Sequence, residues 1–333
     1  MNNNTSLGIV LLQLGGPDAL ENVEPFLYNL FCDPDIIDLP LAFLFRKRLA
    51  RFIARKRAPK VQELYKNIGG RSPILELTNA QARALEDALR PSVDAKVYVA
   101  MRYWHPLTEE TIERVYADRP SRIILLPLYP HYSRSTTGSS VNEWHRLLRS
   151  QKRDPIPTIL IKEYYDHPLY IQAIVQNITA CVEQAPVEER SRIHLVFSAH
   201  GTPMKLVKEG DPYSHHIRRT VEAVMQAGRF GLPHHLCFQS KVGPQKWLEP
   251  SLEQTIERLA AEKATHLVVI PIAFVSDHIE TLSEINIEAR EQAEHLGVKF
   301  FAMTPGLNTH PVFIRALADL VLRHAKKEEG VGV

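Results

Sequence analysis

The carboxylates of one short segment have the spacing to conduct a cation. Glu280, Glu284 and Glu288 follow one another at intervals of four residues, and no Lys or Arg intervenes before Arg290. In an α-helix this spacing places the three side chains on one face, spread over roughly 12 Å. Like charges at this spacing repel each other, whereas a surface helix usually interleaves opposite charges. The segment is either a solvated acidic face or a cation path.

A histidine elsewhere in the chain has the setting of an acid–base group. His200 ends the apolar run HLVFSAH, and Gly201 leaves space beside it. The reference pKa of histidine, about 6.5, lets it exchange protons near neutrality or bind a metal. Such a histidine is more often structural when it stands alone, but Glu280 is expected near it, which favours function. HExxH and paired-cysteine spacings are absent from the sequence, so a tightly bound zinc is disfavoured.

The composition sets broad limits on what the protein can be. A chain of 333 residues has room for two domains, and 44% hydrophobic with 23% charged residues is typical of a soluble globular protein. The net charge of +2 favours neither nucleic acid nor membrane as a partner. Three scattered cysteines, Cys32, Cys181 and Cys237, fit a reducing compartment. Without a signal peptide or a run of ~20 apolar residues, we expect a cytoplasmic protein.

Short apolar runs alternate with helical patterns along the chain. This predicts parallel sheets flanked by helices, as one sheet of eight strands or, better matched to the length, two sheets of four. The expected strands are 8–14, 97–102, 123–128, 158–161, 194–198, 236–239, 267–274 and 298–303. The expected helices include 78–89, 108–116, 168–185, 212–225 and 252–261.

We therefore predict an α/β protein with two Rossmann-like halves and an active-site cleft between them. The halves are 1–150 and 151–310, and the final helix, within 311–333, is expected to pack back on the first half. A faint repeat between 124–140 and 268–284 supports two similar halves. Ligands in such folds bind beyond the carboxyl ends of the strands, where His200 and Glu280 lie.

Three segments depart from the regular pattern. The stretch 41–60 holds eight basic residues and no acid, so it is a surface for anionic lipid, nucleic acid or an acidic small molecule, or an ordinary solvated helix. The apolar stretch 25–39 is either core or the lip of a pocket. The hydroxyl-rich segment 133–140 can hold an anion at a helix start. Nucleotide-binding fingerprints are absent from the sequence.

Eight motifs resemble those of the ferrochelatase family. They are LQLGGP (12–17), YKNIGGRSPI (65–74), MRYWHPLTEE (101–110), LYPHYSRSTTGSS (128–140), FSAHGTP (197–203), GDPY (210–213), QSKVGPQKWL (239–248) and FVSDHIETLSEI (274–285). The matches are collinear, which an accidental motif would not produce. The resemblance implies insertion of Fe(II) into protoporphyrin IX with release of two protons, late in haem synthesis.

The resemblance also implies roles for individual residues. His200 matches an essential histidine that takes pyrrole protons, binds the metal, or both, and Glu280 matches an acidic partner facing it across the macrocycle. His278, Glu284 and Glu288 match a polar ladder for metal or protons. The implied substrate contacts are wall residues (Gln13, Leu14, Arg102, Tyr103), a hydrophobic lip (Leu27, Leu30, Ile36), propionate-binding positions (Arg57, Tyr65, Ser72) and Trp247.

Departures from the family pattern shape the remaining expectations. Gln13 and Leu14 stand where relatives often have Asn and Met, so ring contacts are expected to differ there. Arg134 replaces a cysteine that binds an iron–sulfur cluster in some relatives, and their Cys-rich tail is absent before Val333. We therefore expect no cofactor, with Fe(II) as a substrate. We also expect peripheral binding to anionic membrane, no nucleic-acid partner, and a monomer or homodimer.

Several alternatives stay open at this point. Coproporphyrin III is the second choice of substrate within the family. A sirohydrochlorin chelatase would share the fold but is expected to lack the GDPY and QSKVGP motifs together. A non-catalytic porphyrin or haem carrier would keep an apolar cleft without needing His200 and Glu280. A nucleic-acid-binding module is least favoured, because the net charge is balanced.

Overall fold

The chain folds into two compact units, each built around its own sheet. The computed structural model describes residues 6–36, 42–240 and 245–326. The first unit runs from the N-terminus to Glu163 and includes the chain from Ile314 onward, and the second is Tyr164–Phe313. Residues 241–244 of the QSKVGP motif and Leu41 of the basic stretch lie outside the described residues.

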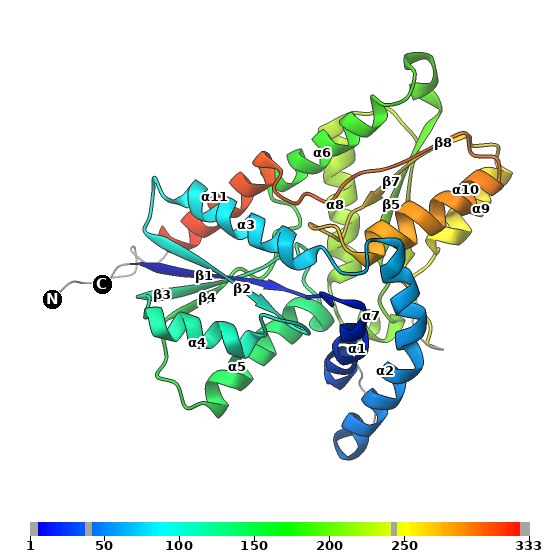
Figure 1. Cartoon of the computed structure of the whole chain (residues 1–333). Coiled ribbons are helices and arrows are strands. Elements are labelled where there is room, and N and C mark those ends of the chain that lie inside the picture. Colours follow the sequence, from blue (N-terminus) through cyan, green and yellow to red (C-terminus); the bar gives the residue numbers. More distant parts are fainter. Residues whose placement is uncertain (1–5, 37–41, 241–244, 327–333) are drawn as a thin grey trace. The chain divides into compact units, whose positions relative to one another are not determined.

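The sheet of the first unit has four parallel strands in the order β2-β1-β3-β4. Every residue of the central strand β1 is buried, which explains its nearly continuous apolar sequence. Figure 1 shows α3 and α11 on one face of this sheet and α4 and α5 on the other. The bounds are β1 Leu7–Gln13, β2 Ala95–Met101, β3 Arg122–Pro127, β4 Thr158–Leu160, α3 Ile74–Leu89, α4 Thr108–Asp118, α5 Ser139–Ser150 and α11 Pro311–Lys326.

The sheet of the second unit repeats this arrangement. Its parallel strands lie in the order β6-β5-β7-β8, so each strand of the first sheet has a counterpart four numbers higher. Figure 1 shows α6 and α8 on one face and α9 and α10 on the other. The bounds are β5 Ile193–His200, β6 His234–Gln239, β7 His266–Pro271, β8 Phe300–Met303, α6 Pro168–Val182, α8 Tyr213–Gly228, α9 Leu252–Ala261 and α10 Arg290–His295.

In each unit, a π-helix follows the third strand along the chain, where an α-helix was expected. The segments are Arg134–Gly138 after β3 and Glu280–Ala289 after β7. The expected α-helical spacing of Glu280, Glu284 and Glu288, here called the acidic ladder, is therefore wrong, because i→i+5 hydrogen bonding widens each turn. Ser283 accordingly reaches Glu288, five residues on, through a hydrogen bond of 3.2 Å. Both π-helices start within the repeat noted in the sequence.

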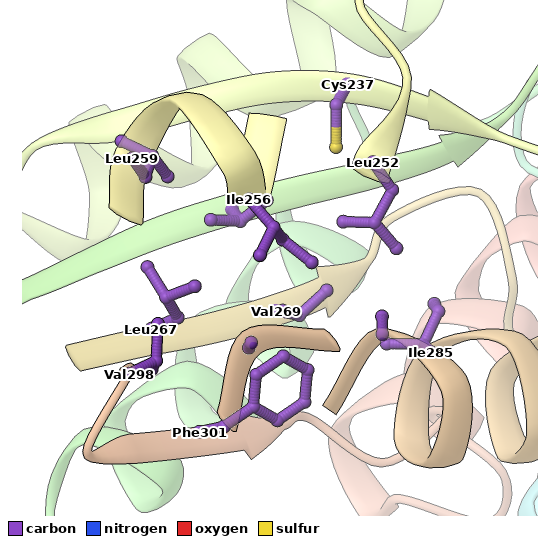
Figure 2. Packing of buried hydrophobic residues seen from close by; sticks show 12 residues of the cluster. Cys237, Leu252, Ile256, Leu259, Leu267, Val269, Ile285, Val298 and Phe301 are labelled. Atoms are coloured by element: carbon purple, nitrogen blue, oxygen red, sulfur yellow. The ribbon is translucent and has the colours of Figure 1, made fainter. Parts of the chain in front are cut away.

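The hydrophobic core of the second unit anchors the π-helix Glu280–Ala289. Figure 2 shows Ile285 from the π-helix beside Leu252 and Ile256 from α9 and Phe301 from β8. Ile285 is fully buried. One face of the π-helix is therefore fixed in the core, which leaves Glu280 and Glu284 on another part of its circumference.

The domain limits differ from those expected. The first unit extends to Glu163, beyond residue 150, because β4 pairs with β3 in the first sheet. The final helix belongs mostly to the first unit, where the Arg122 guanidinium donates to the Ala325 carbonyl oxygen. The eight expected strands are present, although the one expected over 267–274 ends at Pro271.

The remaining helices connect these layers. They are α1 Val23–Cys32, α2 Ala42–Asn67, α7 Met204–Lys208 and the 3₁₀ turns Leu20–Asn22 and Val187–Arg192. The apolar stretch 25–39 thus begins in a helix, and the basic stretch lies on α2. Within the described residues, no helix is both long and apolar enough to cross a membrane.

A histidine pair on the second sheet predicts acid sensitivity. The Arg258 guanidinium lies 3.2 Å from Nδ1 of His235, whose Nε2 lies 3.0 Å from Nδ1 of His194. Burial, Arg258 and His194 lower the pKa of His235 from 6.5 to about 4. The unfolded chain then binds a proton that the folded chain excludes, so stability falls as the pH drops from about 6.5 to about 4. In urea unfolding, His235→Gln should lose less stability between pH 7 and pH 5 than the wild type; an equal loss would contradict this.

Candidate active site

His200 and Glu280 form a hydrogen-bonded pair at the carboxyl edge of the second sheet. His200 is the last residue of β5, and Glu280 opens the π-helix that follows the neighbouring strand β7. Nδ1 of His200 lies 2.8 Å from Oε2 of Glu280. The expectation that these residues face each other across a macrocycle is therefore wrong, since no ring fits into 2.8 Å. Adjacent parallel strands bring their ends together on one side of any substrate.

The electrostatics of the pair make His200 a stronger base than a free imidazole. Burial lowers the pKa of His200, but the charge and hydrogen bond of Glu280 outweigh it and raise the pKa above 6.5. Burial raises the pKa of Glu280, but the charge and hydrogen bond of His200 outweigh it and lower the pKa below its usual value. Because the ionised carboxylate accepts the proton on Nδ1, His200 has Nε2 for proton exchange or metal binding.

His278 is held as a neutral imidazole with one nitrogen available. Its Nδ1 lies 3.1 Å from the Ser276 carbonyl oxygen, which can only accept, so Nδ1 carries the proton. Burial lowers the pKa of His278. The unprotonated Nε2 lies 4.0 Å from Oε2 of Glu280. An unprotonated imidazole nitrogen can accept a proton or bind a cation.

Glu284 occupies the next position of the acidic ladder and is poised between two protonation states. Ser240 donates to its Oε2 at 2.5 Å, and Nε2 of Gln239 lies 3.4 Å from the same atom. Burial and repulsion from Glu280 raise the pKa of Glu284 to about 7. Near neutral pH, Glu284 can therefore take up a proton while Glu280 stays ionised.

Glu288 ends the ladder at the surface. Its side chain is exposed, and its contact is the hydroxyl of Ser283. The three carboxylates thus run from a partly buried pair, where Glu280 is 19% exposed, to solvent. Within residues 6–36, 42–240 and 245–326, no three His, Cys, Asp or Glu side chains converge as a metal site.

A turn beside His200 depends on glycine. A Cβ on Gly201 would lie 2.9 Å from the Gln239 carbonyl oxygen, and the Trp247 ring lies close to it as well. Trp247 is half-buried and pairs with Pro203 through an isolated β-bridge. The structure thus places Trp247 behind the His200 turn, where its packing holds the turn in place.

Two of the four expected wall residues, Arg102 and Tyr103, meet at a carboxylate that the sequence did not single out. Asp33, directly after α1, accepts hydrogen bonds from Arg102 at 2.9 Å and from Tyr103 at 2.6 Å. Ser139, at the start of α5, joins the same carboxylate. Gln13 is buried at the end of β1. Its Oε1 accepts a hydrogen bond from the Leu14 amide at 2.9 Å.

The expected lip and propionate positions lie on α1, α2 and the turn after it. Leu27 is buried, whereas Leu30 and Ile36 are half-buried. The remaining positions differ in exposure: Arg57 is half-buried over the Phe31 ring, and Tyr65 and Ser72 are buried. A Cβ on Gly16 would lie 2.5 Å from Oγ of Ser72, so glycine is required there for the close approach.

The chain is similar to one protein family over nearly its whole length. The ferrochelatase family profile matches residues 6–325. The ferrochelatase of Geotalea daltonii is 48% identical over 314 residues, which cover 94% of this chain and 96% of that one. The ferrochelatase of a Synechocystis species is 48% identical over 322 residues, covering 95% and 82%.

The chain belongs to the ferrochelatase family. It is therefore an enzyme that inserts a metal into a porphyrin, in haem biosynthesis. A ferrochelatase must remove two pyrrole protons and admit a cation, and groups able to do both line the edge of the second sheet. The metal is a substrate of a ferrochelatase, so an open route suits it better than a closed site.

Solved structures support the fold of this ferrochelatase. SirB from Bacillus subtilis with Fe³⁺ superimposes with a TM-score of 0.57 at 12% identity, covering 98% of each chain. CbiX, described as the terminal enzyme of sirohaem biosynthesis in denitrifying bacteria, gives 0.53 at 13% identity, covering 96% and 98%. These likenesses show that the two-sheet chelatase fold is shared.

The exposure of Glu288 predicts that substitutions along the acidic ladder raise the KM for metal by different amounts. Glu288→Gln should raise the KM for metal less than Glu284→Gln does, because water screens the charge of an exposed carboxylate. Steady-state insertion of Zn(II) at several metal concentrations measures both values. An equal or larger effect at Glu288 would contradict the gradient.

Proposed function

We propose that this ferrochelatase inserts Fe(II) into protoporphyrin IX and releases two protons to give protohaem. The observation that carries the proposal is the 2.8 Å contact between Nδ1 of His200 and Oε2 of Glu280. An imidazole held in this way presents Nε2 as a base of suitable strength near neutral pH. The collinear family motifs favour protoporphyrin IX over coproporphyrin III.

The second unit supplies the groups for proton and metal transfer in this proposal. His200 accepts a pyrrole proton through Nε2, and Glu280 stabilises the resulting imidazolium. Glu284, with a pKa of about 7, accepts a further proton. His278 and the three carboxylates guide the cation, since oxygen and imidazole ligands bind Fe(II) without holding it irreversibly.

The first unit supplies the ring contacts in this proposal. Leu27, Leu30 and Ile36 provide apolar surface, and Arg57, with Tyr65 and Ser72, offers donors to the propionates. The proposed enzyme uses no iron–sulfur cluster. Arg134 in the described chain is exposed, and its cationic side chain cannot replace a cysteine thiolate as an iron ligand.

An anaerobic insertion assay tests the proposal. Fe(II) or Zn(II) is offered with protoporphyrin IX and, separately, with coproporphyrin III, and the absorbance of the metalloporphyrin is followed. Faster turnover of protoporphyrin IX is expected. Faster turnover of coproporphyrin III would overturn the substrate assignment, and binding without turnover of either ring would indicate a carrier.

We also propose that α2 binds an anionic membrane surface. Phe45 and Phe52 are 59% and 66% exposed, and exposed basic side chains such as Arg48, Arg51 and Arg55 share the helix. Exposed aromatic rings among cations suit an interface of anionic lipid headgroups. Binding to anionic vesicles should weaken with salt and in Phe52→Ser, and neutral vesicles serve as the control. Equal binding to both vesicle types would refute this role.

A further inference from the structure

Asp33 is the hub of a buried polar network that joins three distant segments of the first unit. Its side chain has no exposed surface. Oδ2 accepts from the Arg102 guanidinium, the Tyr103 hydroxyl and the Ser139 hydroxyl. Oδ1 accepts from the Asp35 amide at 2.9 Å. The carboxylate thus ties the end of α1 to the end of β2 and the start of α5.

The network fixes the position of the Arg102 side chain and compensates its positive charge. Nε of Arg102 donates to Oγ of Ser139 at 2.8 Å, and its guanidinium lies 4.9 Å above the Tyr103 ring. Because the Arg102 side chain is only 13% exposed, water screens its charge poorly. Among the described residues, the carboxylate of Asp33 forms the ion pair that neutralises the Arg102 charge.

Burial also fixes Tyr103 as a hydrogen-bond donor to Asp33. Burial and the negative charge of Asp33 raise the pKa of Tyr103 well above its usual value. The phenol therefore stays protonated and occupies one side of the carboxylate. Since the ring of Tyr103 is 1% exposed, the residue serves mainly to hold this network in place.

We propose that Asp33 is a positioning residue for metal insertion, which holds the Arg102 guanidinium and cancels the positive charge that it would present to an incoming divalent cation. This inference rests on the proposed function and on the expected place of Arg102 in the wall of the porphyrin site. A free guanidinium near the ring would repel Fe(II) or Zn(II). With Asp33 in place, the Arg102 charge is compensated within the first unit, and the wall presents little net positive charge to a cation.

A double-mutant cycle of Asp33→Asn and Arg102→Met tests the inference. Insertion of Zn(II) into protoporphyrin IX gives separate KM values for metal and porphyrin and a kcat for each variant. Asp33→Asn should raise the metal KM about 10- to 100-fold and change the porphyrin KM less. Adding Arg102→Met should restore most of the metal KM, since it removes the uncompensated charge.

A role limited to folding predicts a different pattern. In that case Asp33→Asn would lower kcat without a selective effect on the metal KM, and Arg102→Met would add to the damage. Arg102→Met alone leaves the negative charge of Asp33 uncompensated, so the metal KM should fall, whereas loss of a ring contact would show in the porphyrin KM. This variant carries the test if Asp33→Asn does not fold, and a raised metal KM would then refute the inference.

Asp35→Asn is the matched control. It makes the same chemical change two residues away, where the side chain accepts from Asn142 at 3.0 Å, and should leave the metal KM unchanged. Thermal unfolding of every variant separates loss of fold from loss of function. Absence of insertion by the wild type would refute the proposed function. Insertion by the wild type with an unaltered metal KM in Asp33→Asn would refute only the role of Asp33.

Discussion

Replacing His200 by Ala is expected to lower kcat for metal insertion about 10²- to 10⁴-fold, which is the usual contribution of a positioned acid–base group. Binding of protoporphyrin should persist, because the lost imidazole contributes little of the apolar contact area of a large ring. Porphyrin fluorescence quenching measures binding, and anaerobic Zn(II) insertion measures turnover.

The control for this substitution is His145→Ala. His145 lies exposed on α5, away from the His200 pair in the sequence and in the other unit, so its variant should keep wild-type kcat. If His200→Ala keeps more than about a tenth of the wild-type kcat, His200 is not the principal base.

The second large effect is expected for Glu280→Gln. The value of kcat/KM for metal should fall about 10- to 100-fold in this variant, because it lacks the carboxylate that orients the His200 imidazole and raises its pKa. Its pH profile should change in a defined direction. Glu280 raises the pKa of His200, so its removal lowers that pKa, and the neutral base persists to lower pH. The acid limb of the profile should therefore move to lower pH.

Glu291→Gln is the corresponding control. Glu291 is exposed in the first turn of α10, directly after the π-helix. It should change neither the rate nor the profile. An acid limb that stays in place in Glu280→Gln would show that the pair does not set the protonation of the base.

The strands were predictable because burial dictates their composition. β1, β5 and β7 are buried between helix layers, and their runs of branched apolar residues leave little room for another interpretation. Residues at their carboxyl ends could be assigned to the site for the same reason, since parallel strands gather their ends at one edge. The repeat between the two halves was visible for a related reason, because Pro127 and Pro271 end equivalent strands.

What the sequence did not reveal depends on contacts rather than on patterns. The π-helix Glu280–Ala289 uses the same residue types as an α-helix, so its wider turn leaves no periodic signal over ten residues. Asp33 acts on residues far along the chain, and Ser240 becomes notable only because its hydroxyl reaches both Glu280 and Glu284. The direct contact of His200 with Glu280 follows from the adjacency of β5 and β7, which the strand sequences do not specify.

The repeated strand order has a consequence for how this enzyme can change over evolutionary time. The orders β2-β1-β3-β4 and β6-β5-β7-β8 are the same order written twice, as a tandem gene duplication would leave them. The stretch beyond β3 is rich in hydroxyls, whereas the stretch beyond β7 carries the carboxylates of Glu280 and Glu284. Each unit carries its own hydrophobic core, so a substitution beyond the strands of one sheet can leave the core of the other unit intact.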